Sequence, residues 1–174
     1  MHIKTAILKA VSLAAAKKDL RYYLKGVLIN DRHIVATDGS RLHAARHGAE
    51  WLHGPRIIPI DNLLLALKKK SDLTEITLCS VGDVIYAPVD GVFPAYERVL
   101  PRGTEPEQCP GVMNINPKYL ADACEAIKLA TGESHTLAFS GGNWVYSSAS
   151  LAITVSPTRP TQKFPSLTRL EPFQ

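Results

Sequence analysis

Apolar and polar positions along this chain repeat one arrangement three times: a short apolar strand, a capping residue and a helical stretch. The strand and helix pairs read IKT with AILKAVSLAAAKK, IIPID with NLLLALKKK, and VMNIN with PKYLADACEAIKLA. The candidate N-caps are Thr5, Asp61 and Asn116, and Pro117 suits the first turn of the third helix. Because 56 residues separate Thr5 from Asp61 and 55 separate Asp61 from Asn116, the spacing predicts a repeated supersecondary unit.

Two strand-like runs follow each helix and are joined by a turn signal. They are YYLKGVLI with HIVAT, EITLCS with VIYAPV, and HTLAFS with WVYSSA. The turns contain Asp31, Gly82-Asp83 and Gly142-Asn143, which are residues that favour tight turns. Each unit therefore reads β-α-β-β, and the pattern predicts an α+β fold with antiparallel sheets that carry helices on one face.

The composition is that of a globular protein with a modest positive charge. Lys and Arg number 20 against 16 Asp and Glu, so the formal net charge is +4, which favours anionic partners without identifying one. No run of about 18 apolar residues occurs, and lysines interrupt the apolar N-terminal stretch, so we expect a cytoplasmic protein. Cys79, Cys109 and Cys124 lack CxxC spacing, which argues against a disulfide framework or a zinc site.

Candidate catalytic or metal-binding residues are few. The histidines His43, His47 and His53 suggest a metal site, but no carboxylate or cysteine completes a ligand set with them. Nucleophile elbows, Walker-type loops and paired acidic motifs are absent from the sequence. We therefore expect no enzyme, no metal and no cofactor, with a histidine-based enzyme as the last-ranked alternative.

Three stretches carry a family resemblance: RYYLKGVL (Arg21–Leu28), VATDGSRL (Val35–Leu42) and FPAYERVLP (Phe93–Pro101). Together they resemble the middle domain of the bacterial DNA polymerase III beta sliding clamp. LADACEAIK and AITVSPTRP resemble the last half of the clamp's C-terminal domain. The resemblance implies a clamp-like fold of three half-domain units and a replication-associated processivity factor that recognises partners and performs no bond chemistry.

The resemblance also implies a domain division, since two units make one domain in the clamps. Residues 1–101 would form one complete domain of two units, and residues 111–160 would form half of another. A polar, proline-containing linker, 102–110, would join them, and an irregular tail would occupy 161–174. Segments that resemble the clamp's first domain and the first half of its last domain are missing, so we expect no conventional two-chain ring. Four chains of three units would match the usual twelve.

A peptide-binding pocket is the first role that the resemblance implies. Matching motif by motif places it at Leu24, Thr37, Gly39, Leu42, Pro94, Arg98, Val99, Ser140, Thr154, Ser156, Pro157 and Arg159. Thr154 stands where the family has valine and Ser156 where it has methionine, so this pocket would be more polar. Loss of a buried methionine contact would weaken peptide binding by about 1–3 kcal/mol. Alternatively, Leu24, Leu42 and Val99 are ordinary core side chains of strands.

Duplex DNA binding without base specificity is the second implied role, because clamp helices offer basic side chains to phosphates. The candidates are Lys9, Lys17, Lys18, Arg21, Tyr22, Tyr23, Arg41, Lys68, Lys69, Lys70, Lys118 and Lys128. The lysine runs also fit solvated helix C-termini. If Tyr22 and Tyr23 lie in a strand, they point to opposite faces, so only one could stack on a base.

Two functional hypotheses therefore remain from the sequence. In the first, the chain binds DNA and docks peptides of polymerase or repair proteins, with homo-oligomer formation left open. In the second, it is a clamp mimic or adaptor that binds clamp-binding peptides without encircling DNA.

Overall fold

The computed structural model describes residues 2–51, 54–68, 72–75, 89–101, 106–108 and 113–158. Within these ranges, no helix has both the length and the apolar character needed to cross a membrane. Several expected features lie outside the described residues: most of the second hairpin, most of the linker 102–110, the tail 161–174, His53, Lys69, Lys70, Cys79, Cys109 and Arg159.

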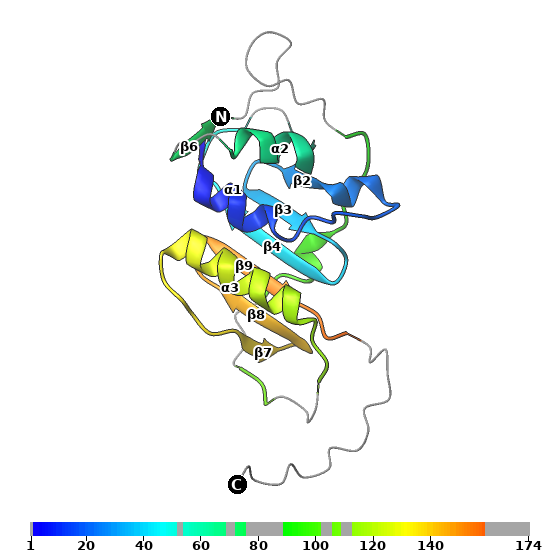
Figure 1. Ribbon diagram of the computed structural model, residues 1–174, viewed down its shortest axis with the longest axis vertical. Helices are drawn as coiled ribbons and strands as arrows, with labels where there is room; N and C mark the ends of the chain where they lie inside the picture. The colour runs from blue at the N-terminus through cyan, green and yellow to red at the C-terminus, as the bar shows by residue number, and fades with distance from the viewer. Residues whose placement is uncertain are drawn as a thin grey trace, which may run out of the picture.

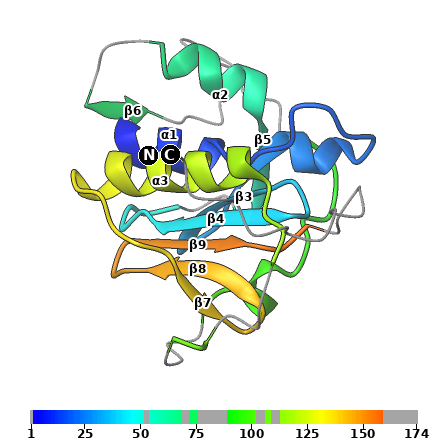
Figure 2. The same ribbon diagram turned by 60° about the horizontal axis from the view of Figure 1, so that its bottom comes forward.

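An antiparallel sheet in the strand order β5-β2-β3-β4-β9-β8-β7 dominates the structure. Its strands are β2 (Gly26–Ile29), β3 (His33–Thr37), β4 (Arg41–Arg46), β5 (Arg56–Pro59), β7 (Ala138–Ser140), β8 (Asn143–Ser147) and β9 (Leu151–Val155). A separate pair joins β1 (His2–Lys4) to β6 (Leu73–Glu75). The helices are α1 (Thr5–Ser12), α2 (Ile60–Ala66) and α3 (Pro117–Thr131). Figures 1 and 2 show α1 and α3 lying across the same face of the large sheet.

The α+β architecture with helices on one face is confirmed, and several local boundaries differ from the sequence prediction. Asn116 caps α3 as expected, accepting a hydrogen bond from the Lys118 N–H at 3.0 Å. Thr5 instead begins α1, and its N–H donates to the Asp72 carbonyl at 2.9 Å. Asp61 likewise lies inside the first turn of α2, after Pro59. A contact from a distant part of the chain thus accompanies the start of α1, whereas α2 begins directly after Pro59.

The motif YYLKGVLI is a strand only from Gly26 onward. Tyr22–Lys25 forms a 3-10 turn, in which the Tyr22 and Tyr23 rings meet edge to face at 5.9 Å. The prediction that these tyrosines alternate along a strand is therefore wrong. A Cβ at Gly26 would lie 2.4 Å from the Ile57 side chain, so the glycine permits β5 to approach β2 closely.

The main core lies between the sheet and the helices. Ile7, Leu8 and Val11 of α1 are buried there, and α3 contributes Ala123, Ala126 and Ile127. Ile153 and Val155 of β9 belong to the same cluster. The core therefore includes residues from both sides of the expected linker. The division into domains at that linker stays a prediction.

A second cluster covers the opposite face of the sheet, here called the outer face. Leu28, Val35, Leu42, Ala44 and Ile57 alternate with the helix-side residues along their strands. Tyr96 is buried against them, and further partly buried side chains from the same segment are Val89, Phe93 and Leu100. The segment 89–101 thus closes one face of the sheet while the helices close the other.

Arg41 connects the turn between β3 and β4 to α3. Its side chain is only 4% exposed, and its guanidinium bonds to the carboxylates of Asp38, at 3.1 Å, and Asp122. It also lies 4.5 Å from the centre of the Tyr119 ring, a cation–π geometry. Burial alone would raise the pKa of Asp122, but hydrogen bonds from Arg41 and Lys118 outweigh this effect and leave that pKa below its usual value.

Replacing Arg41 should therefore destabilise the protein strongly. Arg41→Gln leaves two carboxylates without their buried cation, which typically costs about 3 kcal/mol. Lys118→Gln is the matched control, because Lys118 binds the same Asp122 with a side chain that is 59% exposed, and it should cost less than about 1 kcal/mol. Urea unfolding measures both changes. Equal losses for the two variants would contradict the structural role of Arg41.

His43 lies fully buried on the helix side of β4. Its Nδ1 is 2.8 Å from the Ala10 carbonyl, so this nitrogen carries the proton and donates. Nε2 is buried too and has no hydrogen-bond partner in the part of the chain that the structure describes. Burial lowers the pKa of His43 to about 4, and the bond to Ala10 offsets only part of that effect.

Stability should consequently fall on acidification. The unfolded chain protonates this histidine below about pH 6.5, whereas the folded protein keeps it neutral down to about pH 4. The free energy of unfolding should drop across this window by up to about 3 kcal/mol from His43. His43→Leu should show a shallower pH dependence, measured by urea unfolding from pH 7 to 4. His135→Gln, at a half-exposed histidine, should keep the parent slope; a parent-like slope in His43→Leu would refute the assignment.

Candidate functional site

The junction of β4 with β9 brings three predicted pocket residues together. Leu42 of β4 pairs with Thr37 of β3 on one side and with Thr154 of β9 on the other. The alternation along the strands directs all three to the outer face. Residues that lie more than 100 positions apart in the sequence thus become neighbours.

The segment 89–101 passes over this junction. The Thr154 hydroxyl donates to the Val99 carbonyl at 2.8 Å, which fixes the segment to β9. The Val99 side chain is 50% exposed, and Pro94 and Arg98 are exposed as well. Val99 therefore offers an apolar surface directly beside the β4–β9 junction.

The predicted pocket residues differ in depth. Leu24, Thr37, Leu42, Ser140 and Thr154 are buried and can form only a floor. The Thr37 hydroxyl is itself occupied, since it donates to the Arg41 carbonyl at 2.6 Å and accepts from the Gly39 N–H at 3.1 Å.

The rim consists of more exposed residues. Ser156 and Pro157 are half-buried, and the Ser156 N–H donates to the Ser40 carbonyl at 2.9 Å. Gly39 has φ +92°, so a side chain there would be strained, and the Arg21 guanidinium would lie 3.3 Å from its Cβ. The β3–β4 turn and the end of β9 thus meet, and the exposed Val99 is bonded to the same strand, β9.

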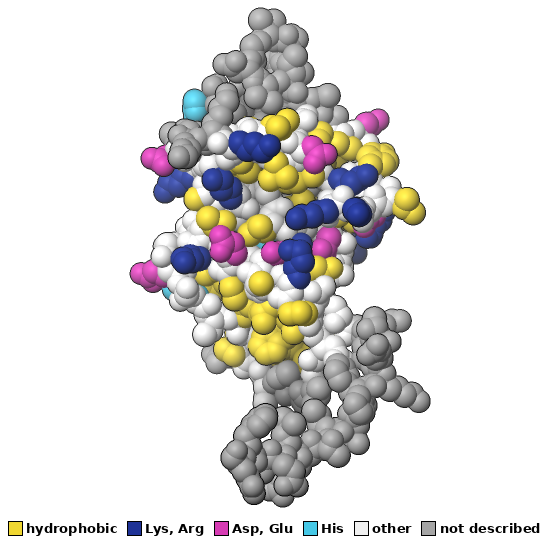
Figure 3. Space-filling model, viewed as in Figure 1, with side chains coloured by type: hydrophobic (Ala, Val, Ile, Leu, Met, Phe, Trp, Pro, Cys, Tyr) yellow, Lys and Arg dark blue, Asp and Glu magenta, His cyan; other side chains and the backbone are white. Residues whose placement is uncertain are grey.

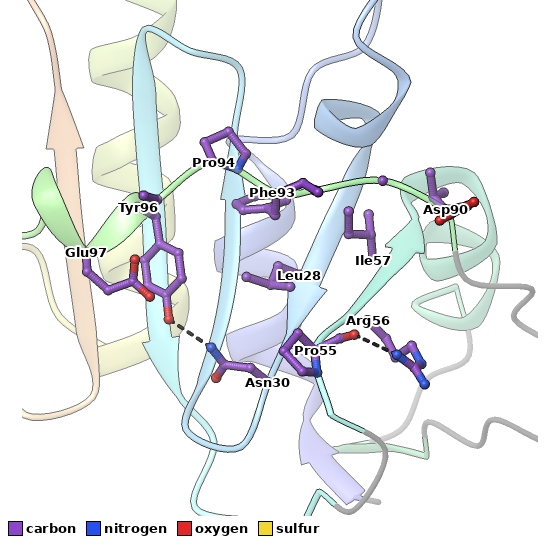
Figure 4. Close-up of a pocket in the computed structure, with 14 residues that line it drawn as sticks. Leu28, Asn30, Pro55, Arg56, Ile57, Asp90, Phe93, Pro94, Tyr96 and Glu97 are labelled. Atoms are coloured by element: carbon purple, nitrogen blue, oxygen red, sulfur yellow. Dashed lines mark hydrogen bonds between the residues drawn. The ribbon is translucent and has the colours of Figure 1, made fainter.

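A separate hollow lies on the outer face, as Figure 4 shows. Its volume is about 580 Å³, and it lies between β2, β5 and the segment 89–97. Leu28, Ile57 and Phe93 supply apolar walls, while the Tyr96 hydroxyl accepts from Asn30 Nδ2 at 2.9 Å. Burial raises the pKa of Tyr96. Of the predicted set, only Pro94 lines this hollow; the buried aromatic positions of FPAYERV were its only sequence signal.

Basic side chains gather on the helix side, where Figure 3 shows them near α1 and the loop that follows it. Lys9, Lys17 and Lys18 are exposed there. Lys25, at the end of the 3-10 turn, is exposed as well. The sequence reasoning passed over Lys25, although it lies in the RYYLKG motif.

Several predicted DNA-binding residues are less available. Arg41 is buried and holds two carboxylates, so its guanidinium does not face solvent. Arg21 is exposed but bonds to Asp19 at 2.8 Å, and its hydrogen bonds lower the pKa of Asp19 to about 2. Lys118 pairs with Asp122 at 3.0 Å.

The remaining predicted contacts lie on three elements. Lys68 follows α2 and Lys128 lies on α3, and both are exposed. Tyr22 is more exposed than Tyr23, so it is the one available for stacking. On α3, Glu125 is also exposed, so this helix carries charges of both signs.

The two described histidines of the candidate metal set each bond a backbone carbonyl. His43 is buried against Ala10, while His47 Nε2 is 2.8 Å from the Asn30 carbonyl. Each nitrogen that bonds a carbonyl must carry a proton, so it cannot bind a metal at the same time.

Comparison with known proteins gives a consistent picture. The sequence is 33% identical over 115 residues to the Beta sliding clamp of Pseudomonas putida, covering 56% of this chain and 31% of that relative. It is 28% identical over 170 residues to the Beta sliding clamp of Escherichia coli K12, covering 86% of this chain and 43% of the relative. The chain therefore spans less than half the length of these curated relatives. No protein-family model matches the chain.

Solved structures agree in fold. The DNA polymerase sliding clamp of Pseudomonas aeruginosa superimposes with a TM-score of 0.62 at 20% identity, covering 92% of this chain and 66% of that one. The DNA polymerase III beta subunit of Thermotoga maritima gives 0.62 at 16% identity, covering 95% and 65%. The chain thus has the sliding-clamp fold, and its sequence resembles part of the bacterial beta sliding clamps.

Proposed function

We propose that this chain is a non-enzymatic, clamp-like DNA-replication accessory protein with separate surfaces for DNA and for peptides. The observation that carries the proposal is the β4–β9 junction, where motifs of the first and third units meet. Leu42 and Thr154 pair directly there, and Val99 lies over them with half of its side chain exposed. The basic side chains lie on the opposite, helix-bearing side of the sheet.

Duplex DNA is the proposed ligand of the helix side. Lys9, Lys17, Lys18 and Lys25 are exposed near one another in the sequence and contact phosphates without reading bases. Tyr22 adds a half-exposed ring beside them that can stack on an unpaired base. Arg41 has no part in this surface, because it stabilises the fold.

A short peptide with apolar anchors is the proposed ligand of the outer-face junction. Val99, Arg98, Pro94 and Pro157 form the accessible wall, and the buried Leu42 and Thr154 form the floor. Among the structural relatives, the Pseudomonas aeruginosa sliding clamp has been solved bound to griselimycin. The subunit from Borrelia burgdorferi has been solved in complex with a natural product. Both support the expectation that this fold accommodates ligands.

Duplex binding should depend steeply on salt. Affinity measured by fluorescence anisotropy should fall between about 50 and 200 mM salt, because each neutralised phosphate releases a counterion. Lys17→Gln, Lys18→Gln and Lys25→Gln combined should weaken binding and reduce the slope of log affinity against log salt by roughly 3. Arg32→Gln is the control, because this exposed arginine lies in the β2–β3 turn. No binding at low salt would remove the DNA role.

Peptide binding should depend on the exposed wall of the junction. Val99→Asp should weaken binding of a labelled glutamine-leucine-phenylalanine peptide at least about tenfold, because it places a charge in an apolar contact. Ser156→Met should tighten binding by restoring the residue type of the clamps. Val92→Asp is a matched control, since Val92 is 87% exposed and lies outside the junction. Isothermal titration calorimetry measures all three.

The peptide role is wrong if both Val99→Asp and Arg98→Ala keep the parent affinity. Leu42→Asp is less informative, because Leu42 is buried and a charge there would disturb the fold itself.

A clamp mimic or adaptor that binds peptides alone is the second candidate. The mixed charge of α3 favours it, since Asp122 holds Lys118 and Glu125 lies exposed on the same helix. Peptide binding combined with no salt-dependent DNA binding would identify this alternative.

A further inference from the structure

The first two units of the chain complete each other by exchanging their leading strands. β5, which precedes α2, pairs with β2, the first strand after α1. Reciprocally, β1, which precedes α1, pairs with β6, the first strand after α2. In each of the two units, the strand before the helix thus pairs with the first strand after the helix of the other unit.

The third unit has the same order of elements but lacks this exchange. Met113–Asn116 precede α3 as β1 and β5 precede their helices, yet they form no strand with any described residue. Among the described residues, a backbone hydrogen bond connects them to the segment after β9, from the Thr158 N–H to the Asn114 carbonyl at 2.8 Å. The prediction of a strand at VMNIN is therefore wrong for the described residues 113–116, because a strand needs a partner edge.

The edge that would receive such a strand is β7. Among the described strands it pairs with β8 alone, and it ends the strand order of the sheet. The Phe139 carbonyl points to the open side, where it accepts from the Glu107 N–H at 2.7 Å. Antiparallel alternation then directs the Phe139 N–H to the same open side. A single residue therefore covers this edge in the described part of the chain.

The helix-side face of the third unit is also incompletely covered. All of β2 is buried and β3 nearly so, whereas Trp144 and Tyr146 of β8 are only half-buried. The Trp144 Nε1 atom is buried without a hydrogen-bond partner among the described residues. Ile115, Leu129 and Leu137 are half-buried around the same core. Figure 3 shows hydrophobic side chains gathered on this side below α3.

We propose that two copies of this chain pair through their third units, with Met113–Asn116 of each copy adding to β7 of the other. The exchange would copy the one between β5 and β2, and it would cover Trp144 and Tyr146 on both chains. The pairing is isologous, because each copy gives one strand and offers one edge. Two copies then share one complete domain between them.

A second copy is the occupant that the geometry favours. The surface needs both a donated strand and a receiving edge, and the third unit itself carries this complementary pair. The four residues 113–116 match the length of β5, which fills the corresponding place in the first unit. An exposed sheet edge beside uncovered apolar residues is otherwise an aggregation hazard. The dimer proposal does not depend on DNA binding or peptide binding, so a failure of those roles would not contradict it.

Sedimentation equilibrium of the full chain is the primary test. The parent should show twice the single-chain mass of 19.0 kDa at micromolar concentrations. Ile115→Asp and Tyr146→Asp should each weaken the dimer at least tenfold. Val92→Asp, an exposed apolar residue on the outer-face segment, should leave the mass unchanged.

A variant that is expected to strengthen the dimer separates the proposal from a loss of the dimer through misfolding. Glu107→Pro removes the N–H that caps Phe139, so it should free the β7 edge and tighten the dimer. Amide exchange over residues 137–140 should also slow as protein concentration rises, because the partner strand protects the Phe139 N–H. A single-chain mass at all concentrations up to about 0.5 mM would overturn the proposal. A dimer whose stability is unchanged by Ile115→Asp, Tyr146→Asp and Glu107→Pro would overturn it as well.

Discussion

The pairing of β4 with β9 is the contact on which the rest of the structure depends. It joins a strand of the first unit to a strand of the third, so the sheet, both of its faces and the candidate peptide site depend on one seam. On the helix side of the sheet, Arg41 of β4 connects this junction to α3 by binding Asp122. Such a buried pair is costly to break, although its net stabilisation against an apolar replacement is small. Its main effect is to fix the position of α3 over the sheet.

The sequence predicted the repeating units well because their signals are local. Hydrophobic periodicity located the three helices, turn residues located the first and third hairpins, and Asn116 with Pro117 marked the start of α3. The errors have distant causes. The strand after Tyr22–Lys25 begins only where Gly26 meets Ile57. The role of Arg41 depends on Asp122, which lies 81 residues away, so its charge alone suggested an exposed contact.

Motif matching grouped part of the candidate site, but it could not predict how deeply each side chain lies. Motif matching named Leu42, Thr154 and Val99, and the strand register makes them neighbours. Whether each side chain is floor or wall depends on the path of the segment 89–101 over the outer face, which no local pattern reveals. The same path creates the hollow lined by Phe93 and Tyr96, for which the sequence analysis made no prediction.

The polar character of the junction has a structural consequence of its own. The Thr154 hydroxyl donates to the Val99 carbonyl at 2.8 Å. A valine there would leave that carbonyl without this donor, at a cost of about 1 kcal/mol or more if the group stayed buried. The threonine therefore anchors the segment that carries Val99 and Arg98. The hydroxyl that makes the junction more polar thus also holds the exposed Val99 in place.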